Sequence, residues 1–206
     1  MDGRARGTLV VLAVTGVLRL PAFAWPAISD DEAIYDAMAH TINAGGVMYR
    51  DAVDHKPPGL AYTYALVERW RPPGLSEMEA VHALGLALAL LTAYGLIVVA
   101  RQLGADRVAP LAGLLYGVAS AAKVPYDGLA VNGELLMNAP AVWAVWAVLR
   151  GGRAGGGQRL AWDLAAGALV GLAGLAKWQA LVTGLPFPFF AAFALRPGAG
   201  ASLGAL

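Results

Sequence analysis

Long apolar runs separated by short polar breaks are the dominant pattern of this chain. A bilayer core about 30 Å thick is crossed by about 20 apolar residues in a helix, and two runs meet that length clearly, from Thr8 to Ala27 and from Ala80 to Ala100. Weaker runs of similar character follow near Val108–Pro125, Val131–Leu149, Leu160–Ala176 and Ala180–Leu195. The pattern predicts an all-α polytopic membrane protein with about six transmembrane helices.

A polar stretch lies between the first two runs and carries helix signals of its own. Ser29 followed by Glu32 is the sequence of a capping box, and Gly45-Gly46 is a stop signal, so a helix is expected over residues 30–44. A second helix is expected from Pro57 to Trp70, with proline in its first turn. The chain is therefore expected to be one membrane domain over 1–206, with a first transmembrane helix at 1–27, an outer loop with two surface helices at 28–78, and further transmembrane helices at 79–206.

The first surface helix has two contrasting stripes at about 100° per residue. The polar stripe consists of Glu32, Asp36, His40 and Asn43. The apolar stripe consists of Ile34, Met38 and Ile42. Glu32 is thus expected to face water and cap the helix, whereas Asp31 is expected to point toward the apolar side, where a carboxylate is costly unless it is paired or used. The alternative is that Asp31 and Glu32 have no other role than to interact favourably with the positive, N-terminal end of the helix dipole.

The distribution of charge predicts an orientation, because Lys and Arg concentrate in cytoplasmic loops. With the N-terminus inside, the inner segments hold Arg4, Arg6, Arg101, Arg107, Arg150, Arg153, Arg159 and Arg196. The outer segments hold Asp30, Asp31, Glu32, Asp36, Asp51, Asp54, Glu68, Glu77, Glu79, Asp127 and Glu134. We therefore expect a cytoplasmic N-terminus and an outer first loop, in a bacterial inner or plasma membrane.

Composition removes several classes of function. Hydrophobic residues make up 58% of the chain and charged residues 14%, with a net charge of +1, so there is no concentrated basic face to bind nucleic acid. The chain has no cysteine, which excludes disulfides, thiolate zinc sites and cysteine nucleophiles. A divalent metal remains a weak alternative, because Glu32, Asp36 and His40 could share one. The same three residues also suit an ordinary solvated helix face.

Several basic groups are candidates for binding an anion. The run Asp54-His55-Lys56-Pro57-Pro58 either suits a phosphate at a helix start or forms a plain loop. Arg19, late in the first span, either reaches outward to pair with the loop acids or only marks the boundary of the span. Other charged residues border the remaining outer loops, where each either joins a site or anchors the membrane interface; they are Lys123, Asp127, Glu134 and Lys177.

A set of motifs in the first loop resembles a known family. The motifs are Asp31-Glu32, Tyr35, Gly45-Gly46, Tyr49-Arg50-Asp51 and Lys56-Pro57-Pro58. In this order and spacing they resemble the first outer loop of C-type membrane glycosyltransferases, in the protein-mannosyltransferase and aminoarabinose-transferase-like group. Weaker similarities are Asn132-Gly133-Glu134 and the segment GLAGLAKWQALVTGLP at Gly171–Pro186.

The resemblance implies a multispan enzyme that moves a sugar from a polyprenyl phosphate to a hydroxyl of an acceptor glycan, lipid or protein outside the cytoplasm, next to membrane lipid. It makes Asp31 the general base, which accepts the proton of the acceptor hydroxyl. Glu134 would be a second carboxylate that orients acceptor or sugar, and Glu32 is the partner acid of the pair. One-step displacement would invert the anomeric centre. No cofactor is required, with a divalent metal as the alternative.

The leaving phosphate needs positive charge more than a proton donor. Lys56 and Arg50 are the first candidates for that role, and Lys177 and Lys123 follow. The expected supporting residues are Tyr35, Tyr49, His55 and Arg19.

Family members are typically more than twice this length, so the chain is expected to be an N-terminal portion that lacks part of the lipid groove. Two other readings stay open. The chain could be half of a transporter or flippase, although its acids gather in the outer loops rather than at the membrane midplane. It could also be a non-catalytic remnant or subunit that binds only lipid or a partner.

Overall fold

The computed structural model describes residues 2–122 and 127–185. Within these residues the chain forms helices joined by turns, and the one β feature is an isolated bridge between Met48 and Ala52. The predicted all-α class is therefore confirmed. Lys123 and most of the expected span at 180–195 lie outside the described residues.

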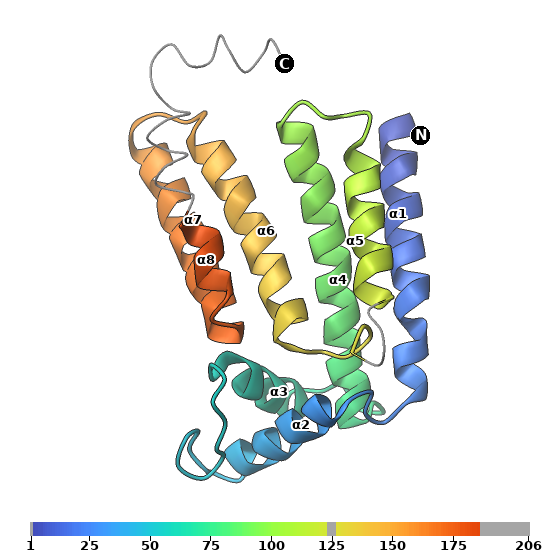
Figure 1. Cartoon of the computed structure of the whole chain (residues 1–206), viewed down its shortest axis with the longest axis vertical. Helices are drawn as coiled ribbons and strands as arrows, with labels where there is room; N and C mark the ends of the chain where they lie inside the picture. Colours follow the sequence, from blue (N-terminus) through green and yellow to red (C-terminus); the bar gives the residue numbers. More distant parts are fainter. Residues whose placement is uncertain (1, 123–126, 186–206) are drawn as a thin grey trace.

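The long helices run alongside one another as a bundle (Figure 1). They are α1 (Gly3–Arg19), continued by a 3-10 turn at Leu20–Ala24, then α4 (Glu77–Gln102), α5 (Ala109–Ala121), α6 (Gly133–Gly151) and α7 (Gly156–Ala176). The short α8 (Ala180–Gly184) turns back along α7. Because α4 packs against α1, α5 and α6, it occupies the centre of the bundle, and α6 connects it to α7.

Part of this bundle has the length and composition expected of membrane-spanning helices. Three described segments are long and apolar enough to cross a membrane, namely Gly3–Ala24, Glu77–Gln102 and Gly156–Ala176. The helix α5 has only 13 residues, and α6 carries Glu134, Asn138 and an internal Pro140 among its apolar residues. The expected count of six spans is thus not reached by the described helices.

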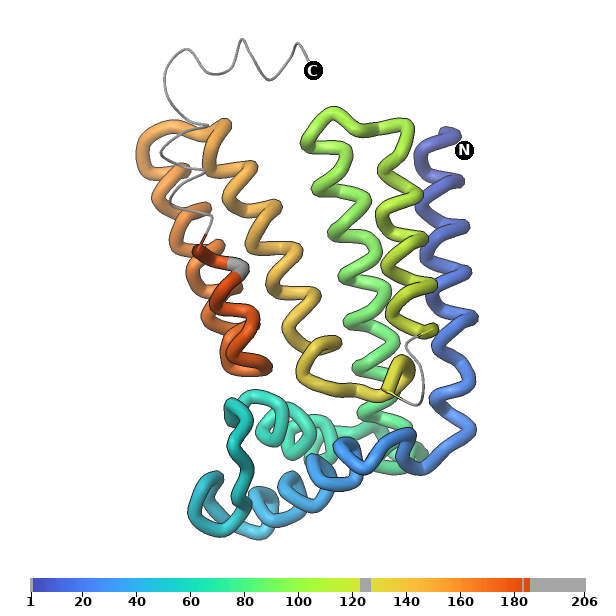
Figure 2. The backbone as a smooth tube through the Cα atoms, in the orientation of Figure 1, coloured from blue at the N-terminus to red at the C-terminus, as the bar shows by residue number. Residues whose placement is uncertain are grey.

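The two ends of the bundle differ in what they carry. The N-terminus and the α4–α5 and α6–α7 turns lie at one end, and the helices α2 and α3 lie at the other (Figure 2). At the first end, Arg101 donates a hydrogen bond to the Thr8 hydroxyl at 2.8 Å, and Arg153 donates to the carbonyl of Gln102. The described arginine-bearing segments that were expected to share one side therefore do share one end, and Arg196 lies outside the described residues. Which end faces the cytoplasm stays a prediction.

The two predicted surface helices are present as α2 (Asp30–Asn43) and α3 (Gly59–Arg69), within two residues of their expected bounds. They pack on each other across the end of the bundle. Half of the predicted capping box forms, because the Ser29 hydroxyl accepts a hydrogen bond from the Glu32 N–H at 3.4 Å. In the other half, the Glu32 carboxylate accepts from the Ile28 N–H at 2.7 Å and not from Ser29 itself.

The predicted faces of α2 are wrong at two positions. Glu32 has no exposed surface, whereas Ile34 is 47% exposed. The buried face of the helix consists of Glu32, Tyr35, Met38 and Ala39. Helical spacing alone misassigned Glu32 because a buried acid whose partners come from other helices has the same pattern as a solvated acid.

Two glycines allow the end of α7 to approach the segments that carry the candidate site. A Cβ on Gly59, at the start of α3, would lie 2.4 Å from the carbonyl oxygen of Leu175. A Cβ on Gly133, at the start of α6, would lie 3.0 Å from the carbonyl oxygen of Ala176. These close approaches bring Lys177 beside both α6 and the loop that precedes α3.

Candidate active site

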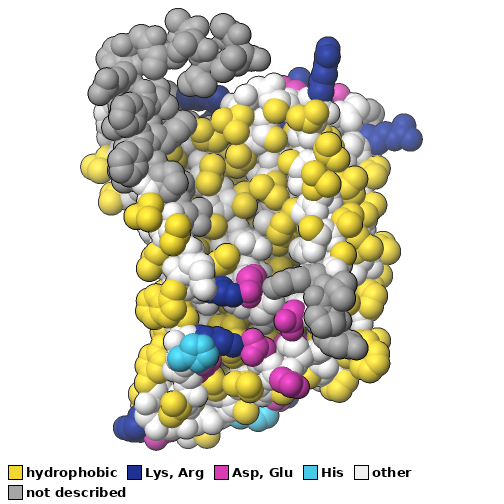
Figure 3. Space-filling model, viewed as in Figure 1, with side chains coloured by type: hydrophobic (Ala, Val, Ile, Leu, Met, Phe, Trp, Pro, Cys, Tyr) yellow, Lys and Arg dark blue, Asp and Glu magenta, His cyan; other side chains and the backbone are white. Residues whose placement is uncertain are grey.

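A cavity of about 290 Å³ lies where α2, the loop before α3, the start of α6 and the end of α7 meet. Seven of the polar residues considered from the sequence line it: Asp31, Tyr35, His55, Lys56, Asp127, Glu134 and Lys177. Figure 3 shows acidic and basic side chains gathered at this level, below the largely hydrophobic surface of the bundle. The cavity thus brings together groups from four separate stretches of sequence.

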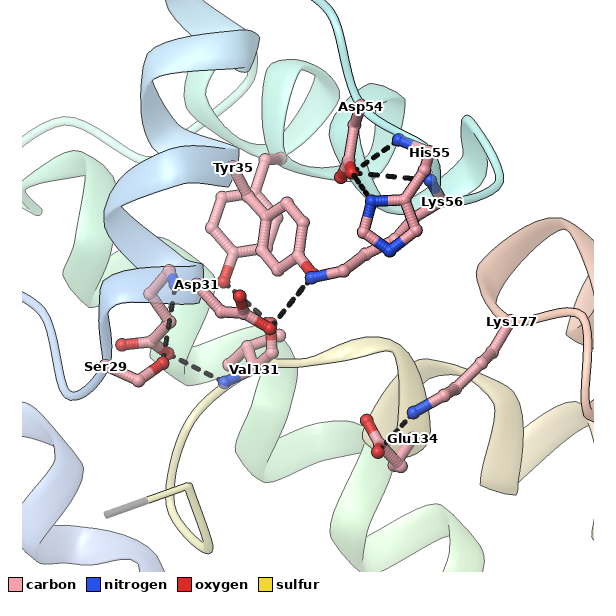
Figure 4. A network of polar contacts seen from close by, with 11 residues as sticks. Ser29, Asp31, Tyr35, Asp54, His55, Lys56, Val131, Glu134 and Lys177 are labelled. Carbon is pink, nitrogen blue, oxygen red and sulfur yellow. Dashed lines mark hydrogen bonds and ion pairs between the residues drawn. The ribbon is translucent and has the colours of Figure 1, made fainter.

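Asp31, Tyr35 and Lys56 form one connected group (Figure 4). The Lys56 ammonium lies 2.9 Å from Oδ2 of Asp31 and donates to the Tyr35 hydroxyl oxygen at 2.5 Å. The Tyr35 O–H donates in turn to Oδ2 of Asp31 at 3.3 Å. Partial burial acts to lower the pKa of Lys56, but the contacts with Tyr35 and Asp31 outweigh it and hold that pKa above its ordinary value. Lys56 is therefore a firmly charged cation in contact with the candidate base.

Glu134 and Lys177 form a second acid–base pair on the opposite wall of the cavity. Glu134 stands in the first turn of α6, and Lys177 is the residue that ends α7. Both side chains are about one-third exposed, at 38% and 29%. The cavity therefore has an ammonium group and a carboxylate on each of two walls.

The loop before α3 sets the position of Lys56. Oδ1 of Asp54 accepts from the backbone N–H of His55 at 2.7 Å and lies 3.0 Å from its imidazole Nδ1. The Tyr49 hydroxyl donates to the Lys56 carbonyl at 2.9 Å. Tyr49 has a φ of 70°, which costs free energy for a side-chain-bearing residue and is retained only where surrounding contacts enforce it. Tyr49 therefore acts on this loop from outside the cavity, consistent with a supporting role.

Glu32 holds α2 in place from beneath the cavity. Its Oε1 accepts from the Val131 N–H at 2.7 Å, and the imidazole Nε2 of His82 lies 3.3 Å from the same oxygen. Burial would raise the pKa of Glu32, but the hydrogen bonds from His82, Ile28 and Val131 outweigh it and keep that pKa below its ordinary value. Glu32 is therefore a buried carboxylate that positions its neighbour Asp31, and it does not line the cavity.

His82 is the functional residue that sequence reasoning missed. It lies within the apolar run of α4 and is 2% exposed. A histidine inside a membrane span signals a buried partner, and that signal was present in the sequence.

The segment Asp127–Asn132, which leads into α6, is fixed by residues from three other helices. Arg19 is 2% exposed and donates to the carbonyls of Gly128 and Leu129 at 3.3 and 3.4 Å. The Tyr64 hydroxyl donates to the Val131 carbonyl at 2.7 Å, while Glu32 binds the Val131 N–H. Of the two alternatives for Arg19, pairing with the loop acids is not seen among the described contacts, where Arg19 binds backbone carbonyls. Its effect is to place the start of α6 and hence Glu134.

Other candidates fall outside the cavity. The Arg50 side chain is 71% exposed and pairs with Asp51 at 2.7 Å, so the structure does not place it at the site. Lys123 lies outside the described residues. The expected metal group of Glu32, Asp36 and His40 is not formed, because the Glu32 carboxylate is bound to His82 and to backbone N–H groups.

The arrangement can hold an anion between two ammonium groups and can accept a proton on a carboxylate a few ångströms away. Further lining residues, to which no role was assigned from the sequence, are Pro57, Leu60, Asn132, Trp178 and Gln179, which add apolar and amide surface. No family model, no curated protein and no solved structure matches this chain. The functional conclusion therefore depends on the geometry of the site and on the motif resemblance.

Proposed function

We propose that this chain is a membrane glycosyltransferase of the C-type kind, which transfers a sugar from a polyprenyl phosphate to an acceptor hydroxyl at the α2–α3 end of the bundle. The observation that carries the proposal is the cavity itself, in which Asp31 and Glu134 face Lys56 and Lys177 at the end of apolar, membrane-length helices. A lipid-linked donor requires a polar site at the edge of the bilayer. Further spans of the expected six-span architecture belong to the same proposal.

Asp31 acts as the general base. Lys56 and Tyr35 both contact its Oδ2, which leaves Oδ1 for the acceptor hydroxyl. As the acceptor oxygen bonds to the anomeric carbon, its proton passes to Asp31. The bond from that carbon to the phosphate oxygen breaks at the same time, and its electron pair leaves with polyprenyl phosphate. One displacement inverts the anomeric centre.

Lys56 connects donor binding to the candidate base. Before donor enters, the Lys56 ammonium is held on Oδ2 of Asp31 at 2.9 Å. When the donor phosphate enters, it competes with Asp31 for Lys56, and Lys177 offers a second cation to the same anion. Asp31 is therefore released from Lys56 only once donor is present, while Glu134, partly released by Lys177, orients the sugar or acceptor.

An apolar hollow next to the site supports a lipid donor. It has a volume of about 210 Å³ and is lined mainly by Leu84, Leu88, Leu136, Pro140, Leu172 and Leu175. Gly59 and Ala176 border it at the same level as the polar cavity, which Ala176 also lines. An isoprenoid chain could lie there with its phosphate between the two lysines. A transport pathway is less well supported, because the charged side chains of the site line one cavity beside α2 and α3, at one end of the bundle.

The test is sugar transfer by protein expressed from its complete reading frame and reconstituted in liposomes. A panel of polyprenyl-phosphate hexoses and pentoses is supplied, and released polyprenyl phosphate is measured. We expect release with at least one donor, and we expect it to be lost in Asp31→Asn but retained in Asp30→Asn, the exposed neighbour on the same helix. Equal turnover in the two variants would remove Asp31 from the mechanism.

A further inference from the structure

A second cluster of titratable side chains lies outside the cavity, where α2, α3 and α4 meet. Nε2 of His40 lies 2.9 Å from Oε2 of Glu77, at the start of α4, and 3.9 Å from Oε2 of Glu68, at the end of α3. Asp36 stands one turn before His40, and one ligand atom from each of Asp36, His40 and Glu77 lies within 4.8 Å of the others. Three elements thus converge on one imidazole.

Two carboxylate oxygens in this cluster are buried without a hydrogen-bond partner among the described residues. They are Oε1 of Glu68, whose side chain is 2% exposed, and Oδ1 of Asp36. Glu68 also lines the hollow into which His40 and Glu77 project. A buried carboxylate with an unsatisfied oxygen is costly unless a cation compensates it. Burial, and next the nearby Asp36, raise the pKa of Glu68 to about 7.

The neighbouring polar groups already orient the carboxylates. Arg71 contacts Oε1 of Glu77 at 3.0 Å, which leaves Oε2 toward His40. Asn43 donates to Oε2 of Glu68 at 3.4 Å, which leaves Oε1 unpaired. Outer partners of this kind commonly fix the ligands of metal sites.

We propose that Asp36, His40 and Glu77 bind a divalent metal ion of the zinc class. Zinc takes imidazole nitrogen and carboxylate oxygen at about 2.0 to 2.2 Å in a tetrahedron, so its ligand atoms lie about 3.3 Å from one another. One ligand atom from each of the three residues lies between 2.9 Å and at most 4.8 Å from the others, so adjustment of the side chains alone would bring these atoms to the spacing that zinc requires. Glu68 is a further carboxylate beside this group, 3.9 Å from Nε2 of His40. A metal here joins α2 to α4 and so stabilises the helix that carries Asp31, independently of the proposed transfer reaction.

The test is direct binding of Zn²⁺ to the full chain, purified in detergent without a polyhistidine tag and stripped with a chelator. Calorimetric titration is expected to show one Zn²⁺ per chain. The unfolding temperature is expected to rise with the Zn²⁺ concentration, because an ion bound only by the folded state stabilises it by mass action. Mg²⁺ at the same concentrations should give no comparable rise, since it prefers octahedral oxygen sites.

Variants separate a built site from surface adsorption. His40→Ala and Glu77→Gln should weaken Zn²⁺ binding by about 100-fold or more, since even loss of an outer partner costs about 10- to 100-fold. Asp36→Asn should also weaken it, while Asp30→Asn makes the same change on an exposed position of the same helix and should bind like the wild type. The unfolding temperature of each metal-free variant is recorded first. Absence of a saturable wild-type site, or equal binding by His40→Ala, would overturn the proposal whether or not sugar transfer is found.

Discussion

Removal of the Glu32 carboxylate should cost more stability than any other single change among the acids near the cavity. Glu32 has no exposed surface and accepts hydrogen bonds from Ile28, Val131 and His82. Glu32→Ala would leave three donors from three separate segments without their acceptor, two of them buried. Those segments are the approach to α2, the approach to α6, and α4.

The magnitude follows from the cost of stranded polar groups. One buried donor without a partner costs about 1 to 3 kcal/mol, and Glu32→Ala leaves three donors without their acceptor. We therefore expect Glu32→Ala to lower the free energy of unfolding by about 3 to 5 kcal/mol. Glu32→Gln keeps one carbonyl acceptor and the side-chain volume, so its expected loss is smaller, about 1 to 3 kcal/mol.

The assay is equilibrium unfolding in mixed micelles, followed by tryptophan fluorescence. A double-mutant cycle with His82→Ala should give a coupling energy of about 0.5 to 3 kcal/mol, because the two side chains are in contact. Asp30→Asn is the matched control and should stay within about 0.5 kcal/mol of the wild type. If Glu32→Ala also stays within that range, the buried network does not hold the site, and the positioning role assigned to Glu32 is refuted.

Three further outcomes follow from the same contacts. The pKa of Glu32 is lower in the folded protein than its ordinary value of 4.5, so ionised Glu32 adds stability that is present above pH 4.5 and is lost as pH falls through the folded-state pKa. As the pH is lowered from about 4.5, the unfolding temperature should therefore decrease, and it should decrease less steeply in Glu32→Gln. Gly59→Ala places a Cβ 2.4 Å from the Leu175 carbonyl, and should cost about 1 to 3 kcal/mol in an unfolding titration, whereas Gly167→Ala meets nothing within 4 Å and should not destabilise. Lys177→Met should raise the KM for the donor in the liposome assay, because it removes one of two cations from the phosphate; an unchanged KM would place the phosphate elsewhere.

Much of the fold was predictable because its signals are local. The bounds of α2 and α3 followed from Ser29, Gly45-Gly46 and the proline at the start of the second helix, and the apolar runs gave the long helices. The number of spans was less predictable. The run Val131–Leu149 is mostly apolar and was counted as a span, but the helix that it forms begins at Gly133, has Glu134 in its first turn and contains Pro140.

The candidate site was predictable in its residue types and less so in its partners. The motif order pointed to Asp31, Tyr35 and Lys56, which do meet in one cavity. Pairings across the bundle, such as Glu32 with His82 and Arg19 with the carbonyls before α6, depend on helix packing that helical spacing does not encode. For the same reason, helical spacing grouped Glu32 with Asp36 and His40, whereas in the structure the acid beside these two residues is Glu77, from another helix.

The most direct measurement is single-turnover transfer in Asp31→Asn with donor binding measured separately. The contact between Asp31 and Lys56 predicts a split result: the Kd for the polyprenyl-phosphate donor should stay the same or fall, because Lys56 is released, while the rate of sugar transfer falls by about 10²- to 10⁴-fold with loss of the base. A rate of transfer equal to that of the wild type, at saturating donor, would contradict the account.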